Sequence, residues 1–157
     1  MPPPTAVELA PDYYLSNFRA LLDFVVSRYE ELLSVEERAF YADFQRLPPD
    51  SQRLYVRLLS RKGVPSSAGA LFRQSKLAYT EISALPRAAE QLVDTGLLQQ
   101  NPALPLAEIL PLFTKAELLP RSRSPLPQSI KRPALEQALL EQALESGEFT
   151  ADESILA

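Results

Sequence analysis

The sequence predicts a mainly α-helical protein, and three observations support this fold class. Apolar residues recur at helical spacing in several segments, prolines and capping residues stand where those segments begin, and glycines stand where two of them end. The chain has 157 residues, of which 46% are hydrophobic and 23% charged. This size and composition suffice for one core, or for two small cores side by side.

The N-terminal part predicts a pair of helices after a proline-rich start, residues 1–12, that we expect to be disordered. Over residues 13–33, the apolar residues at helical spacing are Leu15, Phe18, Leu22, Val25, Tyr29 and Leu32 or Leu33. Ser34 and Glu37 predict a capping box for a second helix that runs to about Arg46. The residues that this helix is expected to bury are Val35, Phe40 and Phe44. Its aromatic residues fit a core better than a base-stacking surface, because the acidic segment would repel phosphates.

A third helix, residues 52–62, combines an apolar arc with a basic stripe. At about 100° per residue, the arc contains Leu54, Tyr55, Leu58 and Leu59, and the neighbouring stripe contains Arg53, Arg57 and Arg61. Pro48 to Asp50 predict its start, and Gly63 predicts its end. One face can therefore pack while the other meets an anion. The alternative is an ordinary helix with a solvated arginine face.

Positive charge is concentrated around this helix. The formal net charge of the chain is -4, yet residues 46–76 carry 7 basic and 1 acidic groups, a net charge of +6. Residues 1–45 carry 3 basic and 8 acidic groups, a net charge of -5, and the two remaining segments, 77–120 and 121–157, carry -3 and -2. Phosphate binding depends on such a local patch rather than on the overall charge.

The segment after the third helix predicts a winged helix-turn-helix-like order. Residues 63–69 lack periodicity and contain two glycines and a proline, so we expect an exposed loop. Residues 71–73 and 76–79 are short apolar and basic segments that predict a strand and a turn. A helix from about Pro86 to Thr95 then ends at Gly96, and Leu97 and Leu98 predict a return strand.

The composition excludes several function classes. The chain contains no cysteine and no histidine, so thiol catalysis, cysteine metal sites and histidine general bases are excluded. The acidic pairs lie on helix surfaces or in the tail, where solvation explains them. No apolar run approaches the ~20 residues of a membrane span, and the N-terminus lacks a signal-peptide pattern. We expect an intracellular protein, in the cytoplasm of a bacterium or the nucleus of a eukaryote.

Several stretches resemble the N-terminal region of the Fanconi-anaemia-associated nucleases, the family with a C-terminal VRR-NUC domain. The matching stretches, within about residues 47–140, are Leu54-Tyr-Val-Arg-Leu-Leu-Ser-Arg-Lys62, Phe72-Arg73, Lys76-Leu-Ala-Tyr-Thr-Glu-Ile82 and residues 89–98. In the family an aromatic-Arg pair follows the Arg-Lys pair closely, whereas here nine residues separate Lys62 from Phe72. We therefore carry over no detailed wing geometry.

The second half is similar to a SAP motif, a helix-loop-helix that rests on DNA phosphates. Residues 114–119 predict one capped helix and residues 129–140 a further one, with a proline-rich loop between them. Arg121, Arg123, Lys131 and Arg132 are the basic groups of this loop, and the resemblance implies that they bind one duplex arm. It likewise implies that the other arm meets the phosphate-binding residues Arg53, Arg57, Arg61, Lys62, Arg73 and Lys76.

The resemblance implies the DNA-binding region of a structure-selective repair nuclease, one that cuts 5′ flaps, acts as a 5′ exonuclease and repairs interstrand cross-links. In the family, catalysis belongs to the VRR-NUC domain with its Mn or Mg. We find neither its carboxylate and lysine pattern nor its Val-Arg-Arg signature here, so we expect no catalytic residue, no metal site and no cofactor in this chain. The implied partners are flap or branched DNA and the catalytic domain of the parent polypeptide; a homodimer on DNA stays open.

The domains that we expect are a helical pair at 13–46, a winged-helix-like domain at 47–105 and a SAP-like motif at 106–145. Residues 146–157 would form an acidic tail or the start of a linker to a missing part. The alternative function is a helical protein-interaction module that would dock through exposed Leu106, Ile109, Leu110 and Phe113.

Overall fold

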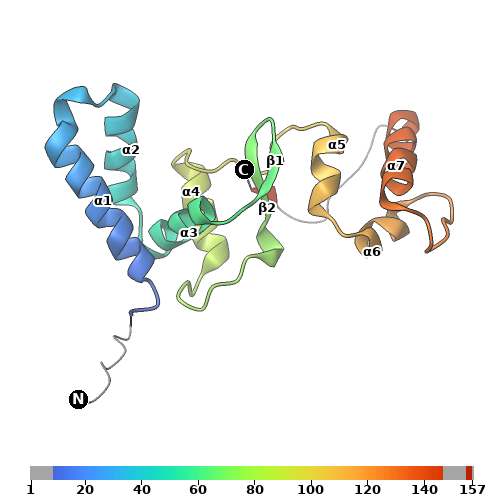
Figure 1. Ribbon diagram of the computed structural model, residues 1–157, viewed down its shortest axis with the longest axis horizontal. Helices are drawn as coiled ribbons and strands as arrows, with labels where there is room; N and C mark the ends of the chain where they lie inside the picture. The colour runs from blue at the N-terminus through green and yellow to red at the C-terminus, as the bar shows by residue number, and fades with distance from the viewer. Residues whose placement is uncertain (1–8, 147–154, 157) are drawn as a thin grey trace, which may run out of the picture. The chain divides into compact units, whose positions relative to one another are not determined.

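The computed structural model describes residues 9–146 and 155–156, and these residues form a mainly α-helical fold, as predicted (Figure 1). Residues 1–8 of the proline-rich start, and residues 147–154 and 157 of the acidic tail, lie outside the described residues. The chain divides into two compact units. Unit 1 comprises the described residues up to Arg61 together with Ala78–Leu98, and unit 2 comprises Lys62–Leu77 and the described residues from Gln99 onward.

Unit 1 consists of four α-helices. Their bounds are α1 Tyr13–Tyr29, α2 Val35–Arg46, α3 Pro49–Ser60 and α4 Leu85–Asp94, and a 3₁₀ turn, Glu30–Leu32, follows α1. The predicted capping box at α2 is confirmed, because the Ser34 hydroxyl accepts a hydrogen bond from the Glu37 amide at 3.1 Å while the Glu37 carboxylate accepts one from the Ser34 amide at 2.7 Å. The start of α2 is therefore fixed by two residues that are three positions apart.

Phe18 of α1 packs with Phe40 and Phe44 of α2 in unit 1, as expected, whereas Tyr13, Phe24 and Tyr29 of α1 are exposed. The Phe18 and Phe44 rings meet edge to face with centroids 5.3 Å apart, and Tyr55 of α3 lies 5.8 Å from Phe40 and 5.9 Å from Phe44. Leu54 of α3 is also fully buried. These rings are occupied in the core and do not form a base-stacking surface.

Three expectations for unit 1 are wrong in detail. The first helix ends at Tyr29 rather than near residue 33, because the chain tightens into a 3₁₀ turn before the cap of α2. Val35, predicted as buried, is exposed, since it is the first residue of α2 and precedes the turns that pack. Leu59 of the predicted apolar arc is also exposed, although Leu58 next to it is buried.

Residues 63–69 are largely exposed, as expected, but they form a hairpin rather than an irregular loop. Val64–Ser66 form strand β1, which pairs antiparallel with β2, Gly69–Arg73. Gly69 has φ +104°, a conformation that favours glycine, and the Ser66 hydroxyl donates to the Gly69 carbonyl at 2.7 Å. At Gly63 a Cβ would lie 2.9 Å from the Leu71 carbonyl oxygen. The glycines therefore permit a tight hairpin, which the lack of periodicity in this segment did not reveal.

The third strand of the sheet is β3, Ile155–Leu156, and not the predicted return strand at Leu97 and Leu98. The amides of Leu97 and Leu98 both donate to the Leu92 carbonyl and close the end of α4, where Gly96 has φ +80°. Both residues of β3 are buried, so this part of the tail is a core element, contrary to our expectation.

Asn101 holds β3 from its other side. Its amide donates to the Ile155 carbonyl at 2.7 Å, and its side-chain Oδ1 accepts from the Ile155 amide at 2.9 Å. Asn101 has φ +48°, a left-handed conformation that asparagine tolerates better than most residues. The β3 strand is therefore bonded on both edges.

The rest of unit 2 is a small helical cluster. Its elements are a 3₁₀ turn at Gln74–Lys76, α5 Leu106–Ile109, a 3₁₀ turn at Leu110–Leu112, α6 Lys115–Leu118, a 3₁₀ turn at Leu119–Arg121 and α7 Arg132–Ser146. The capping box at the start of α6 is present, between Thr114 and Glu117. The last helix begins at Arg132, later than predicted, and continues beyond residue 140.

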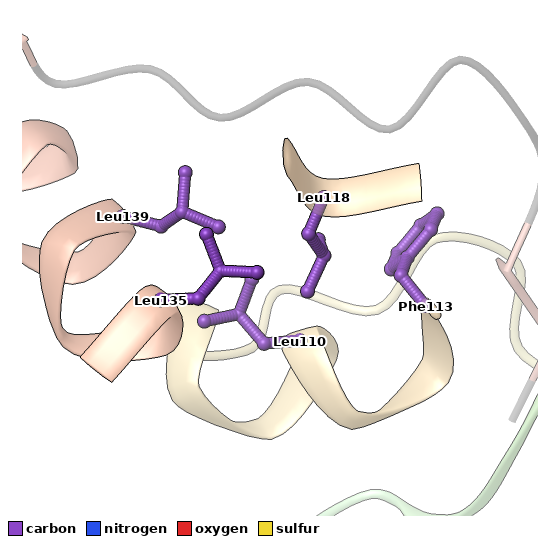
Figure 2. Packing of buried hydrophobic residues seen from close by; sticks show 5 residues of the cluster. All are labelled: Leu110, Phe113, Leu118, Leu135 and Leu139. Atoms are coloured by element: carbon purple, nitrogen blue, oxygen red, sulfur yellow. The ribbon is translucent and has the colours of Figure 1, made fainter. Parts of the chain in front are cut away.

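Five residues form the buried centre of this cluster, namely Leu110, Phe113, Leu118, Leu135 and Leu139 (Figure 2). Leu106 and Ile109 pack against it and are partly buried. The exposed apolar patch that the protein-interaction alternative required is therefore absent, because its four residues belong to the core of their own unit.

Candidate nucleic-acid interface

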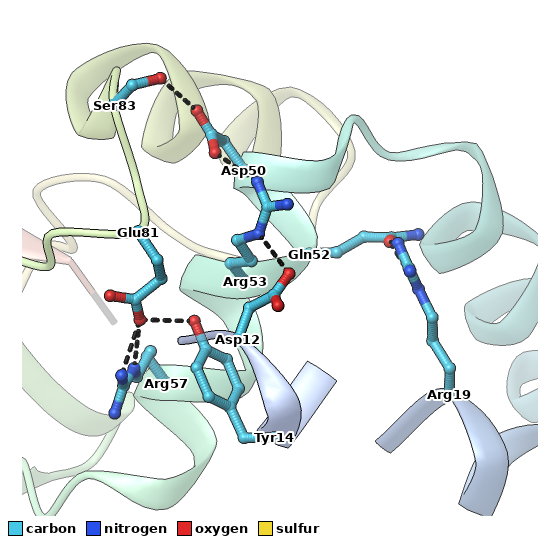
Figure 3. Close-up of polar contacts among 9 residues, drawn as sticks. All are labelled: Asp12, Tyr14, Arg19, Asp50, Gln52, Arg53, Arg57, Glu81 and Ser83. Carbon is cyan, nitrogen blue, oxygen red and sulfur yellow. Dashed lines mark hydrogen bonds and ion pairs between the residues drawn. The ribbon is translucent and has the colours of Figure 1, made fainter. Parts of the chain in front are cut away.

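Arg53 of α3 is held by two carboxylates of unit 1. Its Nε lies 3.0 Å from Asp12 Oδ2 and its Nη1 lies 2.8 Å from Asp50 Oδ1 (Figure 3). Burial would raise the pKa of Asp50, but hydrogen bonds from Ser83 and Arg53 and from the Ala84 amide lower it. The Arg53 charge is therefore largely compensated within the protein.

Arg57, one turn further along α3, binds a buried carboxylate. Its Nε and Nη2 both lie 2.7 Å from Glu81 Oε1, an oxygen that also accepts the Tyr14 hydroxyl at 2.7 Å (Figure 3). The Glu81 side chain is 7% exposed, whereas that of Arg57 is 37% exposed. The guanidinium carbon stands 4.2 Å from the Tyr14 ring centroid and 5.0 Å from that of Tyr79. These contacts leave Nη1 of Arg57 outside the ion pair.

Burial and the contacts among Arg57, Glu81 and Tyr14 shift the pKa values of Glu81 and Tyr14 in opposite directions. Burial would raise the pKa of Glu81, but hydrogen bonds from Tyr14, from its own amide and from Arg57 lower it. Burial and the hydrogen bond to Glu81 raise the pKa of Tyr14 to about 12. Glu81 is therefore a stable anion and Tyr14 a stable neutral donor at physiological pH.

Arg61 and Lys62 are exposed where α3 gives way to extended chain. The contact of Arg61 in unit 1 is a hydrogen bond from Nη1 to the Tyr79 hydroxyl, 3.2 Å long. Both side chains are exposed. The basic stripe predicted on this helix therefore differs along its length. Arg61 and Lys62 at its C-terminal end are exposed to solvent, whereas Arg53 and Arg57 are bound to carboxylates.

In unit 2, the Arg73 side chain is largely enclosed by the protein. It forms a two-point ion pair with Glu117, with Nη1–Oε1 at 2.7 Å and Nη2–Oε2 at 2.5 Å, and its side chain is 10% exposed. The hydrogen bonds from Arg73 and from the Thr114 amide hold the pKa of Glu117 far below its ordinary value. Arg73 and Arg121 lie 4.5 and 5.4 Å from the centroid of the Phe113 ring.

Arg132 serves the helical cluster of unit 2. Its two Nη atoms each donate to a main-chain carbonyl at 2.7 Å, one of Phe113 and one of Leu110, and its Nε pairs with Glu136 at 2.7 Å. These carbonyls belong to the turn before α6, so Arg132 ties that turn to the start of α7. By contrast, the neighbouring Lys131 is exposed, and so are Arg123 and Lys76.

Sequence reasoning found the cations but missed their acceptors. Asp50 stands three residues before Arg53, a spacing that could have indicated this ion pair. Glu81 and Glu117 lie 24 and 44 residues from their arginines, and nothing in the sequence marks such pairs. Gln52 was also missed: it is buried, accepts hydrogen bonds from Arg19 and donates to the Phe44 carbonyl at 2.7 Å (Figure 3).

The described residues present several charged side chains to solvent. Within residues 9–146 and 155–156, no three acidic side chains are placed to hold a metal ion. In the same part of the chain, no helix is long and apolar enough to cross a membrane. The cations exposed on unit 1 and unit 2 can bind anions through charge and hydrogen bonds.

A family model and several known proteins that resemble this chain all belong to the Fanconi-associated nucleases. A family model described as "FAN1, HTH domain" matches residues 12–99. A Fanconi-associated nuclease 1 homolog of Pseudomonas aeruginosa is 40% identical over 146 residues, covering 90% of this chain and 25% of the relative. The human Fanconi-associated nuclease 1 is 33% identical over 110 residues, covering 68% of this chain and 10% of the relative. The chain thus spans a quarter or less of the length of these relatives.

Two solved structures resemble this chain over nearly its whole length. The crystal structure of paFAN1 bound to 1-nt 5′-flap DNA with a gap has a TM-score of 0.72 at 37% identity, covering 94% of this chain and 27% of that chain. The complex with 2-nt 5′-flap DNA has a TM-score of 0.71 at 36% identity, covering 98% of this chain and 28% of that chain.

Proposed function

Because the chain belongs to the Fanconi-associated nuclease family, whose helix-turn-helix domain it contains, we propose that it binds DNA for a structure-selective repair nuclease. The observation that carries the proposal is the similarity, over 94% of the chain, to a family member bound to 5′-flap DNA. The basic segment at residues 46–76 supports it, since local positive charge drives phosphate binding.

In unit 1, we propose that the end of α3 contacts phosphates. Arg61 is exposed, and Arg57 keeps Nη1 outside its ion pair with Glu81. A guanidinium held in place by a carboxylate loses less side-chain freedom when it binds a phosphate. Arg53, bound by Asp12 and Asp50, would mainly fix α3 in position for these contacts.

In unit 2, the residues that would contact phosphates are exposed. They are Lys62, Lys76, Arg123 and Lys131. Arg73, Arg121 and Arg132 add charge while they hold the protein around Phe113 and Leu110. In this proposal the hairpin β1–β2 acts as the wing of a winged helix, and the cluster α5–α7 acts as a SAP-like motif.

Such contacts position DNA without reading its sequence, which suits recognition of a branch or a 5′ flap. Cleavage, including the action on cross-linked DNA, would belong to a metal-dependent catalytic domain of the parent polypeptide. This chain would hold duplex next to the junction and would cut nothing by itself.

The proposal is tested by fluorescence anisotropy with gapped 5′-flap, duplex and single-stranded DNA across a salt series. The double variant Arg61→Ala/Lys62→Ala should weaken binding by about tenfold and reduce the slope of log K against log salt by roughly 2, as expected for two lost phosphate contacts. The pair Arg123→Ala/Lys131→Ala should act similarly.

The matched control is Arg38→Ala, because Arg38 is exposed in the acidic helical pair and donates to the Glu30 carbonyl. It should leave affinity and salt slope unchanged. Absence of binding at low salt, or equal binding by both double variants and the wild type, would overturn the proposal.

A further inference from the structure

Within the described residues, several large apolar side chains of the helical pair are exposed. Four of them are Leu21 and Phe24 of α1, Leu32 of the following turn and Val35 at the start of α2, which we call the hairpin face. Their exposed fractions are 56%, 53%, 80% and 80%. With Tyr29, five of the eight large apolar side chains that are exposed within the described residues fall in the 15 residues 21–35. Exposed apolar residues that are this concentrated mark interaction sites.

The hairpin face is not the surface by which α1 packs into unit 1. Leu15 is buried, and Phe18 stacks against Phe44 of α2. Leu21, Phe24 and Arg28 are three and four residues apart, so they share another stripe of α1. The Arg28 guanidinium carbon lies 5.9 Å from the Phe24 ring centroid. Leu21 and Phe24 are therefore exposed and lie outside the buried core of unit 1.

Carboxylates surround the apolar side chains at the turn between α1 and α2. Glu30, Glu31, Glu36 and Glu37 are all exposed and stand within six residues of Leu32 or Val35. The nearest cations are Arg28 and Arg38, and Arg38 donates to the Glu30 carbonyl at 2.7 Å. The end of the hairpin face at Leu32 and Val35 is thus bordered by acidic residues, whereas Arg28 lies beside Phe24.

The acidic border decides what the face can bind. Phosphate backbones and anionic membrane surfaces carry the same sign of charge and would be repelled. A second copy of the chain, related by a two-fold axis through this face, would place the same carboxylates opposite one another. A protein surface that is both apolar and basic has the complementary chemistry.

From this complementarity, we propose that the hairpin face binds a basic amphipathic helix of a partner protein. The stripe on α1 has the spacing by which one helix packs against another, and 17 residues give α1 a length of about 25 Å at ~1.5 Å per residue. Leucines of the partner helix would cover Phe24 and Leu32, and its lysines would meet Glu30, Glu31 and Glu36.

The probe is a fluorescent 18-residue peptide of leucine and lysine with one apolar helical face, titrated with the chain at low and physiological salt. Phe24→Ser/Leu32→Ser should weaken binding at least about tenfold. The matched control is Leu59→Ser, since Leu59 is also a large exposed apolar residue of unit 1. It should bind like the wild type. Circular dichroism checks that each variant stays folded. We expect it to, because the substituted side chains are exposed.

Several outcomes would overturn the proposal. They are no binding of the peptide at low salt, equal binding of a scrambled peptide without an apolar face, or equal loss in the Leu59→Ser control. Self-association of the wild type that Phe24→Ser abolishes would assign the face to a second copy instead. DNA affinity of Phe24→Ser/Leu32→Ser should remain that of the wild type, so failure here is distinguishable from failure of the DNA proposal.

Discussion

Arg57 in unit 1 and Arg132 in unit 2 are both partly exposed cations on helices, yet the protein binds them in different ways. Arg57 pairs with the buried carboxylate of Glu81. Arg132 instead donates from two of its nitrogens to main-chain carbonyls and pairs with Glu136, a partly exposed neighbour on the same helix. Arg57 is thus part of a network of charged and polar side chains, whereas Arg132 mainly holds a main-chain turn in place. A basic residue in a sequence therefore has no fixed role until its acceptors are known.

The strongest perturbation of either unit is a cavity in its core. Leu54→Ala in unit 1 and Leu135→Ala in unit 2 each remove a fully buried side chain and should cost about 2–5 kcal/mol of the free energy of unfolding. Urea unfolding followed by circular dichroism measures this loss. If both variants lose less than about 1 kcal/mol, the two cores are not packed as described here.

Glu81→Gln should be the most damaging change to the Arg57 network. It leaves a guanidinium and the Tyr14 hydroxyl with a weaker, neutral acceptor, and the side chain it replaces is buried, so we expect a loss of about 1–3 kcal/mol. The control is Glu90→Gln, because the pair Arg87–Glu90 is exposed and should contribute about 0–0.5 kcal/mol. Equal stability of the two variants would contradict the network.

Arg132→Ala tests the other side of the comparison. Two carbonyls of the turn before α6 lose their donors, and because water reaches this site we expect a smaller cost of about 1–2 kcal/mol. Lys131→Ala, one residue away and exposed, should stay within about 0.5 kcal/mol of the wild type. If Lys131→Ala proves as costly as Arg132→Ala, the role given to the carbonyl contacts is wrong.

The free energy of unfolding should depend on pH at acidic pH, because ionised carboxylates stabilise both units. The folded-state pKa values of Asp50, Glu81 and Glu117 lie below their ordinary values, so the unfolded chain binds more protons at acidic pH. Stability is fully present above about pH 4–4.5, the range of unperturbed carboxyls, and falls as the pH decreases through the folded-state values. Melting temperatures between pH 2 and 6 should fall less steeply in Glu117→Gln.

The smallest effect concerns Tyr14, whose phenol is the neutral partner of Glu81. Its pKa of about 12 should appear in an absorbance titration at alkaline pH as a late ionisation step, which is missing in Tyr14→Phe. Between the ordinary tyrosine value of about 10 and this value, only the unfolded state ionises, so stability decreases with rising pH in that window. A Tyr14→Phe titration identical to the wild type would exclude the shift.

Much of the helical framework followed from the sequence, because the interactions that start and end helices are local. Ser34 and Glu37, and likewise Thr114 and Glu117, satisfy each other's backbone groups within three residues. Gly96 closes α4 because a left-handed residue is needed at that position. The excess of basic residues at 46–76 is also a property of the sequence alone.

The tertiary structure decided which cations face solvent and which segments complete the sheet. Arg73 meets Glu117 across 44 residues, and Phe72 pairs with Leu156 across more than 80, and neither contact follows from local spacing. Charge attraction and strand pairing act through space, so any carboxylate or apolar strand of the chain was an eligible partner. Tertiary packing determines which of these possible partners pair. It excludes water from some charged groups and leaves others, such as Arg61, exposed.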